Sequence, residues 1–147
     1  LKFLAILLFL KNKTEFNEPM DAIVYGTVIS LGFATLENFE YVYIPTGDSS
    51  LDIAILRSIT AIPLHASCGI IMGYFFGRYV FSGSKLFLAN SLILPMLFHS
   101  LYNFLCGYFP ALVPALLLVL FRYCYLLHGA FMREQQLKVT ESEQKLG

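Results

Sequence analysis

Charged residues are scarce in this sequence. Of its 147 residues, 14% are charged and 57% are hydrophobic, whereas a soluble globular domain usually carries about 25% charged residues. The formal net charge is zero, so no basic field points to a nucleic-acid partner. Trp is absent, but 14 Phe and 9 Tyr are present, and these suit a bilayer core and its interfaces. The shortage of charge excludes an ordinary water-soluble domain and predicts a membrane protein.

Several well-known catalytic and metal-binding motifs are also missing. The three cysteines lie in apolar runs without CxxC spacing, which is typical of small buried hydrophobic residues. The HExxH helix of zinc proteases is absent. GxSxG is absent as well, and no Ser–His–Asp grouping stands out. Rhomboid-like serine chemistry and a presenilin-like pair of aspartates are therefore disfavoured.

Five apolar segments predict the fold. They are residues 1–10, 21–44, 53–81, 85–109 and 112–132. The last four are long enough to cross the bilayer, which takes about 20 helical residues. They lack the alternation of barrel strands, so helices are the only suitable choice. We predict an all-α polytopic transmembrane bundle of about five helices over residues 1–132, followed by a polar cytoplasmic tail at 133–147.

The chain opens at Leu1, inside an apolar run. We therefore expect a fragment whose first transmembrane helix is truncated. Basic residues occur in the loop 11–20, around the loop 82–84 and in the tail, whereas the loop 45–52 carries only acidic charges. The positive-inside rule then places the first loop, the third loop and the C-terminal tail in the cytoplasm.

Six polar side chains stand inside the predicted spans, where a charged group costs at least about 2.5–3.5 kcal/mol. They are Glu37, Asn38, Arg57, His65, His99 and Asn103. At 1.5 Å per helical residue, Glu37 lies roughly 10 Å, His65 roughly 18 Å and His99 roughly 15 Å below the outer surface. One carboxylate and two imidazoles from three helices are therefore expected in one layer of the membrane.

A cluster of Glu37, His65 and His99 could hold and deprotonate a water molecule, or it could bind zinc. Asn103 follows His99 by four residues, so its amide can reach the same ligand and stabilise an oxyanion. Each residue also has a structural interpretation: a hydrogen-bonded histidine, or a Glu37 or Arg57 that extends to the surface. A non-catalytic scaffold and a proton relay stay open as alternatives, although no inverted repeat of the transporter kind is visible.

Three motifs carry a resemblance to a known family. They are DAIVYGTVISLGFATLENFEYV at residues 21–42, R-x7-H-x7-G at residues 57–73, and HSLYN at residues 99–103. With these motifs the sequence resembles the PrsW family of intramembrane proteases, which is related to the CAAX prenyl-protein endopeptidases and to Aph-1. The resemblance covers nearly all of residues 2–103. It implies hydrolysis of peptide bonds in membrane-anchored proteins, of which an anti-sigma factor is an example, in a bacterial plasma membrane.

The resemblance also implies roles for individual residues. Glu37, His65 and His99 would line the catalytic cavity or bind zinc, with Asn103 assisting, and the supporting residues would be Asn38, Arg57 and Lys2. Lys2 resembles the end of the family's Glu-Glu-x-x-Lys motif, whose glutamates would precede Leu1. A fragment without these carboxylates is expected to be inactive. An Aph-1-like scaffold is the second interpretation, and a transporter or proton relay is the third.

Overall fold

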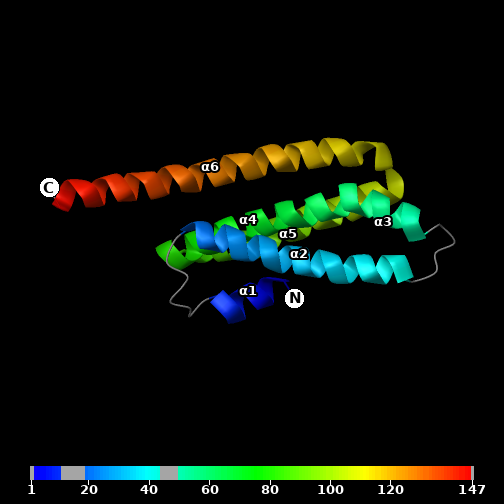
Figure 1. Cartoon of the computed structure of the whole chain (residues 1–147), viewed down its shortest axis with the longest axis horizontal. Helices are drawn as coiled ribbons and strands as arrows, with labels where there is room; N and C mark the ends of the chain where they lie inside the picture. The colour runs from blue at the N-terminus through cyan, green and yellow to red at the C-terminus, as the bar shows by residue number, and fades with distance from the viewer. Residues whose placement is uncertain (1, 11–18, 44–49, 147) are drawn as a thin grey trace.

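The computed structural model describes residues 2–10, 19–43 and 50–146, and these residues are almost entirely helical (Figure 1). The helices are α1 (Lys2–Leu10), α2 (Pro19–Tyr43), α3 (Ser50–Ile59), α4 (Ala61–Ser82), α5 (Lys85–Tyr108), a 3-10 turn (Pro110–Leu112) and α6 (Val113–Leu146). The described residues contain no strand. The predicted all-α class is therefore confirmed.

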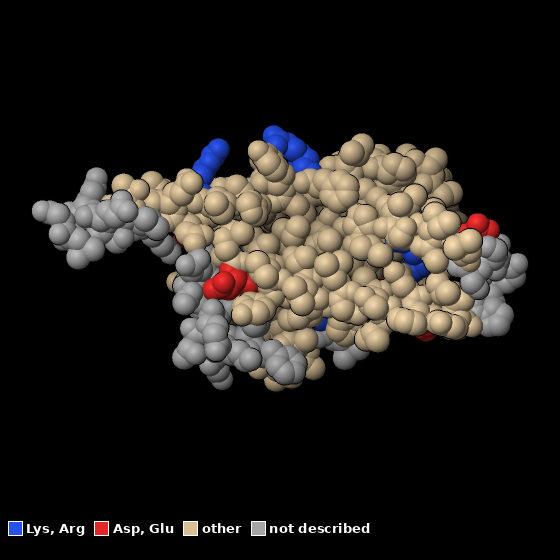
Figure 2. Space-filling model, in the orientation of Figure 1, with Lys and Arg blue, Asp and Glu red and all other residues tan. Residues whose placement is uncertain are grey.

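Four helical stretches are long and apolar enough to span a membrane: Met20–Tyr43, Leu51–Ser82, Lys85–Tyr108 and Pro110–Leu137. They coincide with the four complete spans predicted from the sequence. Figure 2 shows that one face of the molecule is largely uncharged between its two ends, as a lipid-facing surface must be. Helix α6 continues through the described residues of the region 133–146 and projects beyond the bundle (Figure 1).

The third predicted span is interrupted at Thr60, which separates α3 from α4 with the non-helical angles φ −121° and ψ −60°. Pro63 lacks an N–H group, so it cannot donate to the Ile59 carbonyl one turn earlier. The helical hydrogen bonds resume on both sides, from the Thr60 N–H to the Leu56 carbonyl (3.1 Å) and from the Leu64 N–H to the Thr60 carbonyl (3.2 Å). The break sets the last turn of α3 apart from α4.

Helix α4 is the centre of the bundle, and α2, α5 and α6 all pack against it. Its contact with α2 is a close backbone seam. A Cβ atom on Gly73 would lie 2.2 Å from the Ala22 carbonyl oxygen, one on Gly26 would lie 2.6 Å from the Gly69 oxygen, and one on Gly69 would lie 2.7 Å from the Thr27 Cα. Only glycine at positions 26, 69 and 73 permits this approach. The seam therefore fixes the register of α2 against α4.

Candidate active site

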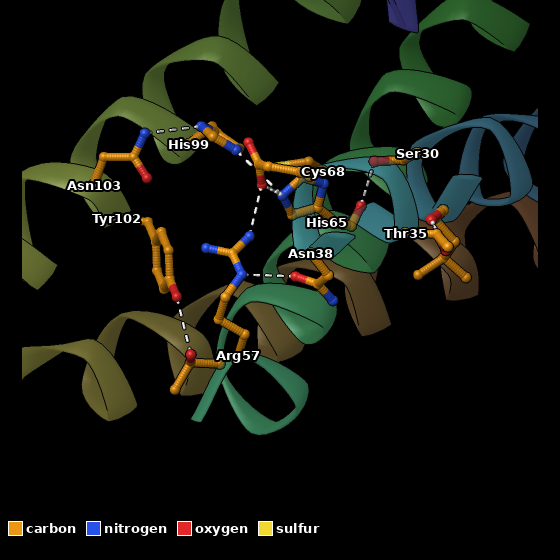
Figure 3. Close-up of polar contacts among 12 residues, drawn as sticks. Ser30, Thr35, Asn38, Arg57, His65, Cys68, His99, Tyr102 and Asn103 are labelled. Carbon is orange, nitrogen blue, oxygen red and sulfur yellow. Dashed lines mark hydrogen bonds and ion pairs between the residues drawn. The ribbon is translucent and has the colours of Figure 1, made fainter. Parts of the chain in front are cut away.

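Three ionisable side chains from three helices, which the sequence placed in one layer of the membrane, meet inside the bundle. The Nε2 atom of His65 on α4 lies 3.0 Å from Oε2 of Glu37 on α2. The same Nε2 atom lies 3.3 Å from Nε2 of His99 on α5. The two imidazoles (Figure 3) lie edge to face, with their ring centroids 5.0 Å apart and their planes at 80°. His65 is only 2% exposed, so the cluster is built around a buried imidazole.

Arg57 in the last turn of α3 points into this cluster rather than out to the surface. Its Nη2 donates to Glu37 Oε2 at 2.9 Å, and its Nε donates to Asn38 Oδ1 at 2.7 Å. Its guanidinium also stacks over the Tyr41 ring, 4.0 Å from the centroid. The fork of Arg57 therefore ties two consecutive residues of α2 to the end of α3, and it holds the Glu37 carboxylate toward His65.

Lys2 on α1 approaches His65 from its other side, with its Nζ 2.7 Å from His65 Nδ1. A lysine ammonium has only hydrogens to offer, so Nδ1 accepts, and the proton of a neutral His65 resides on Nε2. That N–H then points at Glu37 Oε2. The Ser30 hydroxyl donates to the backbone carbonyl of His65 at 2.6 Å. The orientation of His65 is therefore set by hydrogen bonds to its ring, from Lys2 and to Glu37, and by the Ser30 hydrogen bond to its backbone.

Asn103 meets His99 as the four-residue spacing predicted, with Nδ2 3.4 Å from His99 Nδ1. The residue is exposed, and its amide lies at the outer side of the cluster (Figure 3). Tyr102, between these two residues, was given no role from the sequence. Its hydroxyl donates to Thr60 Oγ1 at 2.9 Å, which connects α5 to the break between α3 and α4. A buried polar aromatic residue one turn from His99 was the available signal.

A cavity of about 350 Å³ adjoins the cluster. Glu37 and His99 form part of its wall, and Met72, Leu92 and Met96 add apolar surface. In the described part of the bundle, α2 and α5 both pack on α4 but hardly touch one another. The cavity therefore occupies the space between α2 and α5. Glu37 and His99 lie at the edge of a space large enough to take up a side chain, and the buried His65 contacts both of them.

The cluster also has the donor set of a catalytic zinc site. One atom each from Glu37, His65 and His99 lie within 4.8 Å of one another, and two imidazoles with one carboxylate are a known zinc combination. Tetrahedral bonds of the usual length place neighbouring donors about 3.3 Å apart, close to the two separations given above. A metal on His65 Nε2 requires the proton on Nδ1, where Lys2 now donates. The residues fit zinc if Lys2 moves away from the ring.

A bundle of membrane-spanning helices that gathers a carboxylate and two imidazoles beside a cavity defines a polytopic membrane protein with a buried polar centre. The family model described as "PrsW family intramembrane metalloprotease" matches residues 1–128. The chain belongs to the PrsW family and is an integral membrane protein. No solved structure matches it.

Curated relatives agree with this assignment. The chain is 33% identical over 108 residues to Protease PrsW of Clostridioides difficile (strain 630), covering 71% of this chain and 45% of the relative. It is 36% identical over 108 residues to Protease PrsW of Bacillus subtilis (strain 168), covering 71% and 48%. It is 39% identical over 111 residues to Protease PrsW of Shouchella clausii (strain KSM-K16), covering 74% and 50%. The chain spans about half the length of these relatives, each of which is named as a protease.

Proposed function

We propose that the protein hydrolyses peptide bonds of membrane-anchored proteins and that Glu37, His65 and His99 are its catalytic groups. The observation that carries the proposal is the meeting of these three side chains, from three helices, beside a cavity. Charged and ionisable groups inside membrane spans are costly and usually functional. Family membership and the name of the relatives support the same reaction.

Each polar residue then has a part in positioning or proton transfer. Glu37 accepts a proton from the attacking water, since a carboxylate within hydrogen-bond reach can act as general base. Arg57 and Asn38 hold that carboxylate in place. His99, with Asn103 beside it, faces the cavity from α5 and stabilises the negative charge that develops on the substrate carbonyl. Lys2 and Glu37 hold the His65 ring between them, and His65 positions the attacking water and stabilises the charge that develops, together with His99.

The same residues suit a metal-dependent variant of the reaction. Glu37, His65 and His99 would hold the zinc ion. When bound there, zinc would polarise the scissile carbonyl or activate water. In that form Asn103 and Arg57 would keep their positions beside His99 and Glu37. Lys2 would move away from the His65 ring, and the protonated Nδ1 of His65 could then donate to water. The family description as metalloproteases supports this variant.

The substrate is proposed to be a single-span membrane protein of the anti-sigma-factor type in a bacterial plasma membrane. Amides of an intact helix are bonded within the helix, so the segment must unwind locally before hydrolysis. The cavity then receives the apolar side chain next to the scissile bond, against Met72, Leu92 and Met96. The proposed arrangement has a membrane bundle at residues 1–132 and a cytoplasmic tail at 133–147.

The decisive experiment is cleavage of a single-span substrate by the full-length protein reconstituted in lipid vesicles. Glu37→Gln, His65→Ala and His99→Ala are each expected to lower kcat/KM by about 10²–10⁴-fold, because each removes a proton-transfer or charge-stabilising group. His128→Ala is the matched control, because this third histidine is exposed on α6 and should retain full activity. Full activity in all three site variants would end the proposal.

Zinc binding separates the two forms of the mechanism. If the metal-dependent form operates, the purified protein should carry one zinc per chain, which His65→Ala and His99→Ala should lose. Lys2→Met should tighten zinc binding, since it removes both a competing hydrogen bond and a nearby positive charge. The measurement is elemental analysis together with a competition titration against a chelator. Full activity in zinc-free protein would exclude the metal-dependent form and leave Glu37 as the base.

A further inference from the structure

One arginine side chain, that of Arg122, lies far from the candidate active site, halfway along a membrane span. Arg122 is near the middle of the span Pro110–Leu137, with an unbroken apolar run on its N-terminal side and a mostly apolar one on its C-terminal side. The side chain is exposed. Its guanidinium lies 5.7 Å from the Tyr125 ring centroid. A charge in this position is costly unless something covers it.

The neighbours of Arg122 fix its depth relative to the cluster. Cys124 donates to the Ser67 carbonyl at 3.5 Å, and the rings of Phe98 and Tyr123 lie 6.2 Å apart. Ser67 follows His65 by two residues, and Phe98 directly precedes His99. Arg122 therefore lies in nearly the same membrane layer as the polar cluster, on the opposite side of the bundle.

The side chain points directly away from the bundle. α6 buries Val113, Leu120, Cys124 and Phe131 against its neighbours, and at 100° per residue Arg122 lies about 180° from the centre of that buried face. Figure 2 shows basic side chains standing out from the edge of the molecule that α6 forms. Nine to ten helical residues, about 14 Å, separate Arg122 from either end of its apolar segment. That depth is too great for the side chain to reach a lipid phosphate by extension along the helix.

The residues around Arg122 form a seam suited to another helix. We call this set the α6 outer seam: Ala115, Leu118, Arg122, Tyr125 and Gly129, spaced alternately by three and four residues. All except the half-buried Gly129 are exposed, and a Cβ atom on Gly129 would meet nothing within 4 Å. Alternating spacing of this kind is typical of left-handed helix pairs, and small residues let membrane helices approach closely.

We propose that the α6 outer seam binds a transmembrane helix of a partner protein that carries an Asp or Glu near its centre. The charge of Arg122 selects the partner, because a carboxylate at matching depth neutralises it where water cannot. A second copy of this chain packed through the same seam would place Arg122 against Arg122, so a symmetric dimer is disfavoured. The seam is separate from the cavity between α2 and α5, so partner binding and substrate binding can occur together.

The test uses the full-length protein, labelled and reconstituted in phosphatidylethanolamine–phosphatidylglycerol vesicles. The probes are labelled single-span peptides with an apolar helix and a central Asp, Asn or Leu, and association is measured by energy transfer. The Asp peptide is expected to bind on the order of tenfold more tightly than the Leu peptide. Arg122→Leu should abolish this preference, and the variant should insert well because it removes a buried charge. Arg133→Leu, an exposed site nearer the end of the span, should keep the preference.

A charge swap makes the test sharper. Arg122→Glu should reverse the preference and favour a peptide with a central Lys over one with a central Asp. Equal binding of the Asp and Leu peptides to the unaltered protein would overturn the proposal. This is the result expected if another part of the chain covers Arg122. Disulfide cross-linking of two Leu118→Cys copies in a manner that depends on Arg122 would also overturn it, because the occupant would then be a second copy.

Discussion

The two sides of α4 differ in how closely their neighbours approach. Toward α2, Gly26, Gly69 and Gly73 bring the backbones into direct contact. Toward α5, the contacts pass through side chains, among them His65–His99 and the Cys68 thiol on the Pro95 carbonyl at 3.6 Å. A cavity of about 350 Å³ remains on that side. The close side, toward α2, leaves no space between the backbones, and the loose side, toward α5, leaves the space that we propose for a substrate side chain.

The close side also determines where the carboxylate lies. Glu37 follows Gly26 by eleven residues, about three helical turns along α2. Because the seam and the Ser30–His65 hydrogen bond fix α2 against α4, a shift in register would carry Glu37 away from His65. The seam would therefore affect the proposed reaction by positioning Glu37, without touching the substrate. Each prediction below changes one side of this comparison and leaves the other intact.

The largest effect is expected from Gly73→Ala, on the close side. The added Cβ would lie 2.2 Å from the Ala22 carbonyl oxygen, and because backbone must move, a destabilisation of about 3 kcal/mol is expected, at the upper end for overpacking. Cleavage should be lost as well, since Glu37 moves with α2. The measurement is reversible unfolding in mixed detergent micelles. Gly32→Ala on α2, where a Cβ meets nothing within 4 Å, is the control and should not destabilise; equal stability of both variants would contradict the seam.

Helical spacing explains why the cluster could be predicted. Positions four residues apart share a face, and rise per residue sets depth, so Glu37, His65 and His99 were expected in one layer from the sequence alone. The small-residue stripes on α2 and α4 predicted close packing for the same reason. These are properties of single helices and of the membrane that contains them, and a sequence specifies both directly.

Other features depend on tertiary structure and were not predicted. The break at Thr60 was missed, because a proline in a long apolar run can kink a membrane helix without interrupting it. The approach of Lys2 to His65 Nδ1 depends on where α1 packs, which spacing along α1 does not determine. The cavity depends on the shapes of side chains from several helices. Arg122 was passed over because the apolar residues around it dominate the span.

A smaller and more selective effect is expected on the loose side from Met96→Trp. Met96 lines the cavity, so a larger side chain there should lower kcat/KM about tenfold for a substrate with Leu beside the scissile bond. A substrate with Ala at that position should be cleaved nearly as before, because hydrophobic pockets discriminate by roughly 10–200-fold per methylene-sized change. Leu97→Trp, an exposed neighbour outside the lining, is the control. An equal loss with both substrates would show that the cavity does not receive this side chain.

The smallest effect is expected from Tyr102→Phe, which removes the hydrogen bond to Thr60 and keeps the buried ring. Thr60 lies three residues after Arg57, so the bond steadies the turn from which Arg57 reaches Glu37. Tyr102→Phe and Thr60→Val should each lower stability by about 1 kcal/mol. Each should also lower kcat severalfold with KM unchanged, and the double variant should be no worse than either single one. A loss of stability with kcat unchanged would make the bond purely structural. Additive losses of kcat in the double variant would mean that Tyr102 and Thr60 act separately. A non-additive loss of kcat with KM unchanged would identify Tyr102 as a positioning residue that acts on Glu37 through the end of α3.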